Sequence, residues 1–471
     1  MPKSFFFYDL ETSGLNPRTD RVMQFAGQRT TLDLEPVGEP VNILVQLADD
    51  ILPSPYAIMV TGITPQKTRE EGITEAEFAR FVSEEVFTPD TIAVGFNNIR
   101  FDDEFVRNTL WRNFYDPYEW CWKNGCSRWD LLDVVRMTRA LRPEGINWPV
   151  DKHGAGTNRL ELLTAENNLE HMQAHDALSD VRALIAVTRL IRAKQPKLYE
   201  YLFAMRDKKA VMQLVDPTKP QLFVYSSGRY DSQFHKTTVA VPIGHGSKPG
   251  SVLVYDLRLN PALFVGMSVE DMRRRLYAKR EERQQPDFVP LPIKELAYNR
   301  CPAVAPLGVL EHEDAWARIQ MTPELVQEHR AALFKNPELI HDLSQVLGGK
   351  KFPKSQDVED QLYDNFTPDS DKVKIEAVRN ATAQDIAKFN PHFADDRLTK
   401  LLLHYKARNF PQILSEEERT SWEAYKSQKI QARIPAFMAD LQRIAATTTD
   451  DQQQFLLQEL QLWAESVVSL E

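Results

Sequence analysis

The chain has 471 residues, more than one hydrophobic core usually holds, so two or three domains are expected. Hydrophobic residues make up 42% and charged residues 26%, as in ordinary globular proteins, and no run of about 18 apolar residues predicts a membrane span. The net charge of −10 argues against a uniformly basic nucleic-acid binder but leaves room for a local basic groove. Three cysteines without zinc-site spacing favour a reducing, cytoplasmic location.

Residues 1–196 predict an α/β domain. Short apolar runs predict buried strands at 5–10, 24–32, 41–47 and 92–96. The clearest helix is 176–193, because its apolar residues recur on one face and Asp176 is a suitable N-cap. Pro196 follows this helix, so we place the end of the first domain there.

The rest of the chain predicts a β-containing section and then a helical one. Segments 222–225, 237–243 and 251–256 predict a small antiparallel barrel or sheet, followed by helices at 269–282 and 323–334. From about 351 the chain predicts helices to its end, with a capping box at 415–418. Leu456, Leu460, Trp463 and Val467 recur at helical spacing and are expected in the core.

Two carboxylates stand two residues apart at the end of the first predicted strand. Asp9 and Glu11 point the same way, because alternate residues of a strand share a face. Uncompensated, they would repel each other and one would bind a proton. A divalent cation that prefers hard oxygen ligands, such as Mg²⁺ or Mn²⁺, removes that conflict. An isolated pair of this kind is explained equally well if Asp9 merely ends the strand. Other residues must therefore decide whether the pair forms a metal site.

Further acids and a histidine occur at the ends of later predicted elements. Asp102 follows the strand at 92–96 and an Asn-Asn turn, and Asp180 lies on the helix at 176–193. His175 precedes Asp180 by five residues and by itself is as well explained as a surface residue at a helix start. Asp103 and Glu104 lie beside Asp102 and are rivals for any role assigned to it.

The order and the local sequences of these residues resemble the DEDDh 3′→5′ exonucleases, a superfamily with an RNase H-like α/β domain. The resemblance rests on D-L-E-T-S-G at 9–14, G-F-N-N-I-R-F-D at 95–102 and H-D-A-L-S-D-V at 175–181. It implies two Mg²⁺ ions, for which Mn²⁺ is a possible substitute, and it makes His175 the general base, a role that a pKa near 6.5 suits. The implied metal ligands are Asp9, Glu11, Asp102 and Asp180.

Basic and aromatic residues alternate between 100 and 142, a pattern typical of a channel for single-stranded nucleic acid. Bases stack on aromatic rings there, while cations follow the phosphates. The same segment holds seven acids against eight bases, so it is not a basic patch by count. Several of its aromatic residues are also expected in the core.

Strings outside the carboxylate motifs resemble the bacterial exonuclease I family. They include N-F-Y-D-P-Y at 113–118, S-R-W-D-L-L-D-V at 127–134, A-L-R-P-E-G-I-N-W-P at 140–149, D-Q-L-Y at 360–363 and A-R-N-F-P at 407–411. The resemblance implies an exonuclease domain at 1–196, an SH3-like β-barrel-containing domain at 197–350 and a helical domain at 351–471. It also implies processive 3′→5′ degradation of single-stranded DNA to 5′-mononucleotides, in repair and recombination.

The same resemblance implies DNA contacts and a protein partner. The acidic tail of the single-stranded-DNA-binding protein is the expected partner, and the chain is expected to act as a monomer. The implied DNA-contacting residues are Glu11, Arg107, Tyr118, Trp122, Arg136, Arg142 and Arg159.

Three other hypotheses stay open. A 3′ exonuclease acting mainly on RNA would need a reader of the 2′-hydroxyl. A binding module that had lost catalysis should lack at least one of the metal carboxylates. A scaffold, in which the later domains matter more than hydrolysis, predicts that Asp9→Ala leaves cellular function intact.

Overall fold

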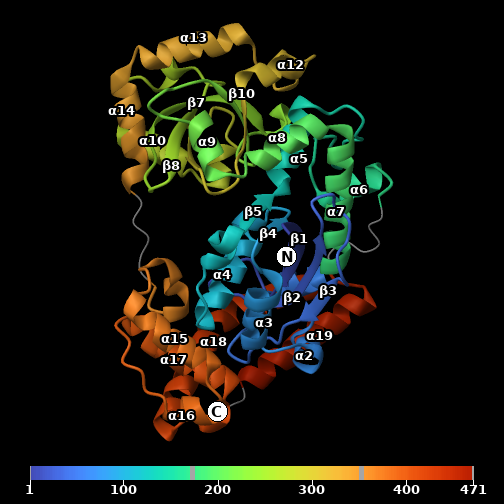
Figure 1. The fold of residues 1–471 in the computed structure, drawn as a ribbon, viewed down its shortest axis with the longest axis vertical. Helices are drawn as coiled ribbons and strands as arrows, with labels where there is room; N and C mark the ends of the chain where they lie inside the picture. Colours follow the sequence, from blue (N-terminus) through green and yellow to red (C-terminus); the bar gives the residue numbers. More distant parts are fainter. Residues whose placement is uncertain (1, 170–175, 350–354, 469–471) are drawn as a thin grey trace. The chain divides into compact units, whose positions relative to one another are not determined.

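The computed structural model describes residues 2–169, 176–349 and 355–468, which form two compact units (Figure 1). The first unit takes in 2–128, 176–185 and 355–468, and the second takes in 129–169 and 186–349. The N-terminal α/β section and the C-terminal helical section therefore belong to one unit. Among the described residues, no helix is long and apolar enough to cross a membrane.

A five-stranded sheet with the order β3-β2-β1-β4-β5 forms the first core. Its centre is β1 (Ser4–Thr12), which pairs antiparallel with β2 (Val22–Thr30) and parallel with β4 (Thr91–Gly95). β3 (Val41–Leu44) and β5 (Ser127–Asp130) are the outer strands. Residues 5–8 of β1 are all buried, because layers of side chains cover both faces of the sheet. The four predicted strands are confirmed, although β2 begins two residues early and β3 ends at Leu44.

Helices connect these strands and cover the sheet. α7 (Ala177–Lys194) confirms the predicted helix, and the Asp176 carboxylate accepts the Ser179 N–H at 3.1 Å, as expected of an N-cap. α7 follows β5 in the chain. Between β3 and β5 lie α1 (Pro55–Thr61), α2 (Pro65–Glu71), α3 (Glu75–Phe81) and α4 (Asp102–Arg112).

The C-terminal section is helical, as predicted. Its helices are α15 (Lys372–Asn380), α16 (Ala383–Lys388), α17 (Asp396–Asn409), α18 (Glu416–Ala445) and α19 (Asp451–Val468). Both hydrogen bonds of the capping box between Ser415 and Glu418 are present at the start of α18. α19 packs against α1 and α2, and its predicted stripe from Leu456 to Val467 is buried there.

The second unit contains an antiparallel sheet with the order β10-β6-β7-β8-β9. Its strands are β6 (Phe223–Ser226), β7 (Thr237–His245), β8 (Ser251–Asp256), β9 (Ile293–Ala297) and β10 (Ala303–Pro306). The first three confirm the predicted strands, and α13 (Pro323–Phe334) matches its predicted bounds. Other helices of this unit are α5 (Leu131–Leu141), α6 (Leu160–Glu166), α8 (Pro196–Ala204), α9 (Lys208–Leu214), α12 (Ala315–Arg318) and α14 (Pro337–Val346).

One predicted helix, 269–282, is wrong. The structure has α10 (Val269–Leu276) and a separate short α11 (Arg280–Arg283). The break is stabilised by the Arg283 guanidinium, which donates to the carbonyls of Leu276 at 3.1 Å and Ala278 at 2.9 Å. These bonds satisfy carbonyls at the end of α10 that a continuous helix would have used internally.

Trp463 tests whether the C-terminal helices are an integral part of the first unit. Its indole N–H donates to the Ile51 carbonyl at 2.9 Å, and its ring lies 4.6 Å from the Arg69 guanidinium carbon. We expect Trp463→Ala to lower the free energy of unfolding by about 3–5 kcal/mol in urea titrations. The neighbouring exposed Leu462→Ala should change it by less than about 0.5 kcal/mol. Equal effects of the two changes would contradict this packing.

Candidate active site

Three of the predicted metal-binding carboxylates lie together in the first unit. Asp9 and Glu11 project from the end of β1, and Asp180 projects from the first turn of α7. One carboxylate oxygen from each residue lies within 4.8 Å of the others. The expectation that alternate strand residues converge is therefore met, and a helix some 170 residues away in sequence supplies the third acid.

Asp102 is the first residue of α4 and is only 4% exposed. The turn after β4 places it there: Asn97 takes a left-handed φ of 70°, which asparagine tolerates, and residues 98–100 form a 3₁₀ turn. The negative charge of Asp102 raises the pKa of both Asp9 and Glu11, so it acts on the same cluster.

The pKa values of the cluster show how strongly the carboxylates conflict. Burial and then the charges of Asp180 and Asp102 raise the pKa of Glu11 from 4.5 to about 8. Burial, Asp102 and Glu11 raise the pKa of Asp9 well above its usual range. Such a cluster cannot be fully ionised at neutral pH without added positive charge. Buried, all-oxygen donors of this kind fit hard divalent cations.

Asp103, the first alternative to Asp102 as a metal ligand, is engaged in other contacts. Asp103 is fully buried and accepts hydrogen bonds from the Tyr8 hydroxyl and from the Asn98 amide at 3.1 Å. Its second oxygen forms an ion pair of 2.5 Å with Arg128. These contacts hold the base of α4 against β1, so Asp103 has a structural role.

Glu104, the second alternative to Asp102, is engaged in contacts along α4. Glu104 pairs with Arg107 at 3.0 Å and accepts a hydrogen bond from the Tyr363 hydroxyl. Arg107 also lies over the ring of Tyr118, with its guanidinium carbon 5.7 Å from the ring centre. Two predicted DNA contacts, Arg107 and Tyr118, are thus brought together.

His175 lies outside the described residues, so its prediction as general base stays a prediction. Asp176, which follows it, caps α7 and also contributes to the raised pKa of Glu11.

Most aromatic residues of the segment 100–142 belong to the core. Trp122 is the exception, with 63% of its surface exposed, and it stays a candidate for base stacking. The five that are buried are Phe105, Trp111, Phe114, Trp120 and Trp129. The alternating pattern therefore reflected core packing more than a continuous aromatic channel.

The C-terminal section contributes aromatic residues that the sequence did not predict for this surface. The rings of Tyr363 and Phe366 each lie 6.3 Å from that of Tyr118, and Phe366 is 87% exposed. Tyr118 and Phe366 line a pocket of about 810 Å³ whose cationic side chains include Lys372 and Arg379. In the sequence, only the D-Q-L-Y string at 360–363 drew attention to this segment, and it indicated no role for Tyr363.

Three predicted DNA contacts belong to the second unit. Arg136 pairs with Asp133 at 2.5 Å on α5, and Arg142 donates to the Val309 carbonyl at 3.2 Å. Arg159 precedes α6, forms an ion pair with Glu161, and its side chain is largely exposed.

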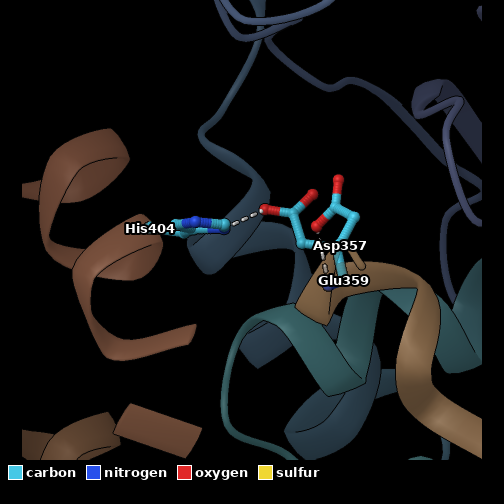
Figure 2. A group of neighbouring side chains, drawn as sticks. All are labelled: Asp357, Glu359 and His404. Atoms are coloured by element: carbon cyan, nitrogen blue, oxygen red, sulfur yellow. Dashed lines mark hydrogen bonds and ion pairs between the residues drawn. The ribbon is translucent and has the colours of Figure 1, made fainter. Parts of the chain in front are cut away.

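A second group with metal-ligand chemistry lies between the C-terminal helices and the first sheet (Figure 2). It comprises Asp357, Glu359 and His404. One oxygen of Glu359 accepts from His404 at 2.9 Å and from Arg408 at 2.6 Å, and its other oxygen accepts from Arg21 at 2.5 Å. Although burial opposes it, the positive charge of Arg408 above all, and then those of Lys429 and Arg21, hold the pKa of Glu359 well below its usual range. Cationic side chains already fill this site.

Comparisons with known families cover most of the chain. Residues 6–188 match the model described as Exonuclease, and 206–348 match the Exonuclease I SH3-like domain. Residues 356–467 match the Exonuclease I C-terminal domain.

Individual relatives match along their full lengths. The exodeoxyribonuclease I of Haemophilus influenzae is 39% identical over 456 residues, which cover 96% of each chain. The crystal structure of Escherichia coli exonuclease I with a dA16 oligonucleotide superposes with a TM-score of 0.94 at 35% identity, covering 99% of this chain and 100% of that one. A zinc-ion-bound E. coli exonuclease I–single-stranded DNA complex gives the same TM-score, identity and coverage.

The raised pKa of Glu11 predicts a pH-dependent stability for the metal-free protein. Between pH 4.5 and about 8 the folded state holds a proton that the unfolded state releases, so this group's contribution to stability falls as pH rises. Glu11→Gln removes the group. In EDTA, the free energy of unfolding of Glu11→Gln minus that of wild type should increase by at least about 1.4 kcal/mol over this pH range, the equivalent of one pKa unit. Urea denaturation of both proteins at pH 5 and pH 8 measures this difference in unfolding free energy. The same difference at both pH values would contradict the raised pKa of Glu11.

Proposed function

The chain belongs to the exodeoxyribonuclease I family, and on that premise we propose which of its residues perform the family's reaction. The protein is a metal-dependent 3′→5′ exonuclease that acts on single-stranded DNA. The observation that carries the assignment of its active site is the convergence of Asp9, Glu11 and Asp180.

Asp9, Glu11, Asp102 and Asp180 would hold two divalent cations, Mg²⁺ with Mn²⁺ as a possible substitute, and Asp9 would serve both. The chemistry that such a pair supplies when bound is activation of the attacking water and neutralisation of charge on the leaving 3′-oxygen. The raised pKa values of Asp9 and Glu11 support this assignment, because added positive charge is what lets the cluster ionise. The zinc-ion-bound E. coli complex supports metal binding in this family.

His175 is assigned as the general base that takes the proton of the attacking water. It precedes Asp180 by five residues in the H-D-A-L-S-D-V string, and an ordinary histidine pKa suits proton transfer at neutral pH.

Single-stranded DNA is assigned to two sets of residues. In the first unit, Glu11, Arg107, Tyr118 and Trp122 contact the strand near the cluster, and the exposed ring of Phe366 adds a surface for stacking. In the second unit, basic side chains neutralise phosphates. These are Arg136, Arg142 and Arg159.

Membership of the family also suggests the domain organisation and the partners of the protein. We assign the exonuclease domain to 1–196, the SH3-like domain to 197–350 and the helical domain to 351–471. The protein acts as a cytoplasmic monomer in DNA repair and recombination, and the acidic tail of the single-stranded-DNA-binding protein binds it. Processive release of 5′-mononucleotides is expected on the same premise.

A time course on 5′-labelled DNA tests the proposal. With Mg²⁺, single-stranded DNA should shorten from its 3′ end, whereas a matched RNA and EDTA-treated samples stay intact. Asp180→Asn should reduce cleavage at least about a hundredfold while the protein still binds the strand, and the exposed Asp33→Asn serves as control. Faster loss of RNA would support the RNA hypothesis instead. No cleavage of any strand would support the binding-module hypothesis.

Trp122 tests the assigned stacking surface. Trp122→Ala should weaken binding of single-stranded DNA by about 1–3 kcal/mol, and equally for dA and dT oligomers, because stacking does not depend on base identity. Fluorescence anisotropy in EDTA measures binding without cleavage. Phe455→Ala, an exposed aromatic residue of α19, is the matched control and should bind as wild type does. A loss confined to one base sequence would refute the stacking role.

A further inference from the structure

The regular pairing of β1 ends at the candidate metal ligand Glu11. The β1–β2 ladder shifts register between Glu11 and Thr12, so the strand pair does not hold the backbone beyond Glu11 in the regular way. After the shift Thr12 still pairs with Val22, and a reciprocal pair of hydrogen bonds follows at the next residue. The Ser13 N–H donates to the Arg21 carbonyl at 2.8 Å, and the Arg21 N–H donates to the Ser13 hydroxyl at 2.9 Å. The Ser13 carbonyl also accepts the Ser54 N–H at 2.7 Å, so Arg21 is one of the groups that fix the backbone directly after Glu11.

The loop between these two residues is folded tightly on itself. A side-chain carbon at Gly14 would lie 2.2 Å from an oxygen of Asp20, so a larger residue there would displace the Asp20 carboxylate. The same Asp20 carboxylate accepts the Asn16 N–H at 2.9 Å. Its other oxygen pairs with Arg433 of α18 at 2.8 Å. One contact with the C-terminal section thus fixes the loop through Asp20.

A second contact with the C-terminal section holds Arg21 itself. The Arg21 guanidinium is buried and forms an ion pair of 2.5 Å with Glu359, which lies in the 3₁₀ turn Val358–Tyr363. Figure 2 shows the Glu359 carboxylate directed toward His404 of α17. Arg408 fixes the same carboxylate at 2.6 Å. Glu359 is therefore a rigid anchor, because it is buried and bonded from several sides.

We propose that Arg21, anchored by Glu359, is a positioning residue that sets the backbone at Ser13 and thereby the carboxylate of Glu11. The inference rests on the proposed function, since it takes Glu11 as a metal ligand. It gives the C-terminal domain a part in forming the metal site, at a distance of 338 residues along the chain.

The chain offers a matched control within the same ionic group. Lys429 contacts Asp50 at 2.7 Å and Glu359 at 3.6 Å. Among the described residues, none of its hydrogen bonds or ion pairs reaches the loop at 13–21, so it shares the buried charges without holding Arg21. Arg21→Met leaves Glu359 with Arg408, Lys429 and His404, and leaves Glu75 with Arg112 at 2.6 Å. Both variants remove one cation from buried carboxylates that keep other partners.

Mn²⁺ binding to the full-length protein, measured by isothermal titration calorimetry without DNA, is the deciding experiment. Arg21→Met should weaken Mn²⁺ affinity about tenfold, the lower end of the effect of groups that orient metal ligands. Lys429→Met should lower the melting temperature comparably but leave Mn²⁺ affinity unchanged. Ser13→Ala removes only the hydroxyl that accepts the Arg21 N–H, disturbs no buried charge, and should weaken affinity in the same direction.

Glu11→Gln separates failure of the inference from failure of the proposed function. If Glu11→Gln binds Mn²⁺ as tightly as wild type, the proposed metal site itself is wrong. If Glu11→Gln loses binding while Arg21→Met and Ser13→Ala bind as wild type does, the positioning role is overturned and the metal site stands. Equal loss of affinity in Arg21→Met and Lys429→Met would likewise overturn it, because the effect would then follow general stability.

Discussion

Repulsion among buried carboxylates at the end of β1 is the constraint around which the first unit is arranged. β1, α4 and α7 each deliver acids to one place, and the strongest described charges acting on Asp9 and Glu11 are all negative. Elsewhere in the same unit Glu359 is buried as deeply, but cationic side chains surround it. One acidic cluster is neutralised by the protein, and the other is suited to bound cations. This contrast in surrounding charge distinguishes the structural cluster at Glu359 from the one proposed to bind metal.

The helical C-terminal section is part of the structure that supports the site. Its α19 packs on α1 and α2, its α18 binds Asp20, and its 3₁₀ turn binds Arg21. Buried ion pairs of this kind contribute little net stability compared with apolar contacts, but losing one partner is costly because a buried charge is left behind. Their value here lies in fixing one loop conformation directly after β1, while apolar packing at Trp463 holds the section in place.

Local sequence patterns predicted what depends on local geometry. Alternation in β1 predicted that Asp9 and Glu11 converge, and a helical stripe with an N-cap predicted α7 with Asp180 on its first turn. The aromatic residues near α4 show the limit, because a pattern of rings and charges does not reveal which rings a distant helix will bury. Pairing of Arg21 with Glu359, and of Tyr118 with Phe366, joins residues hundreds of positions apart. The family resemblance, and no spacing rule, selected His175, whose role stays a prediction.

Anomalous diffraction from crystals soaked in Mn²⁺ tests the central claim most directly, because it locates bound ions without relying on activity. Two groups in the described chain have metal-ligand chemistry, and the account distinguishes them by their charge surroundings. It predicts anomalous peaks between Asp9, Glu11 and Asp180, and none at Asp357, Glu359 and His404. A peak at the second group with none at the first would contradict the account.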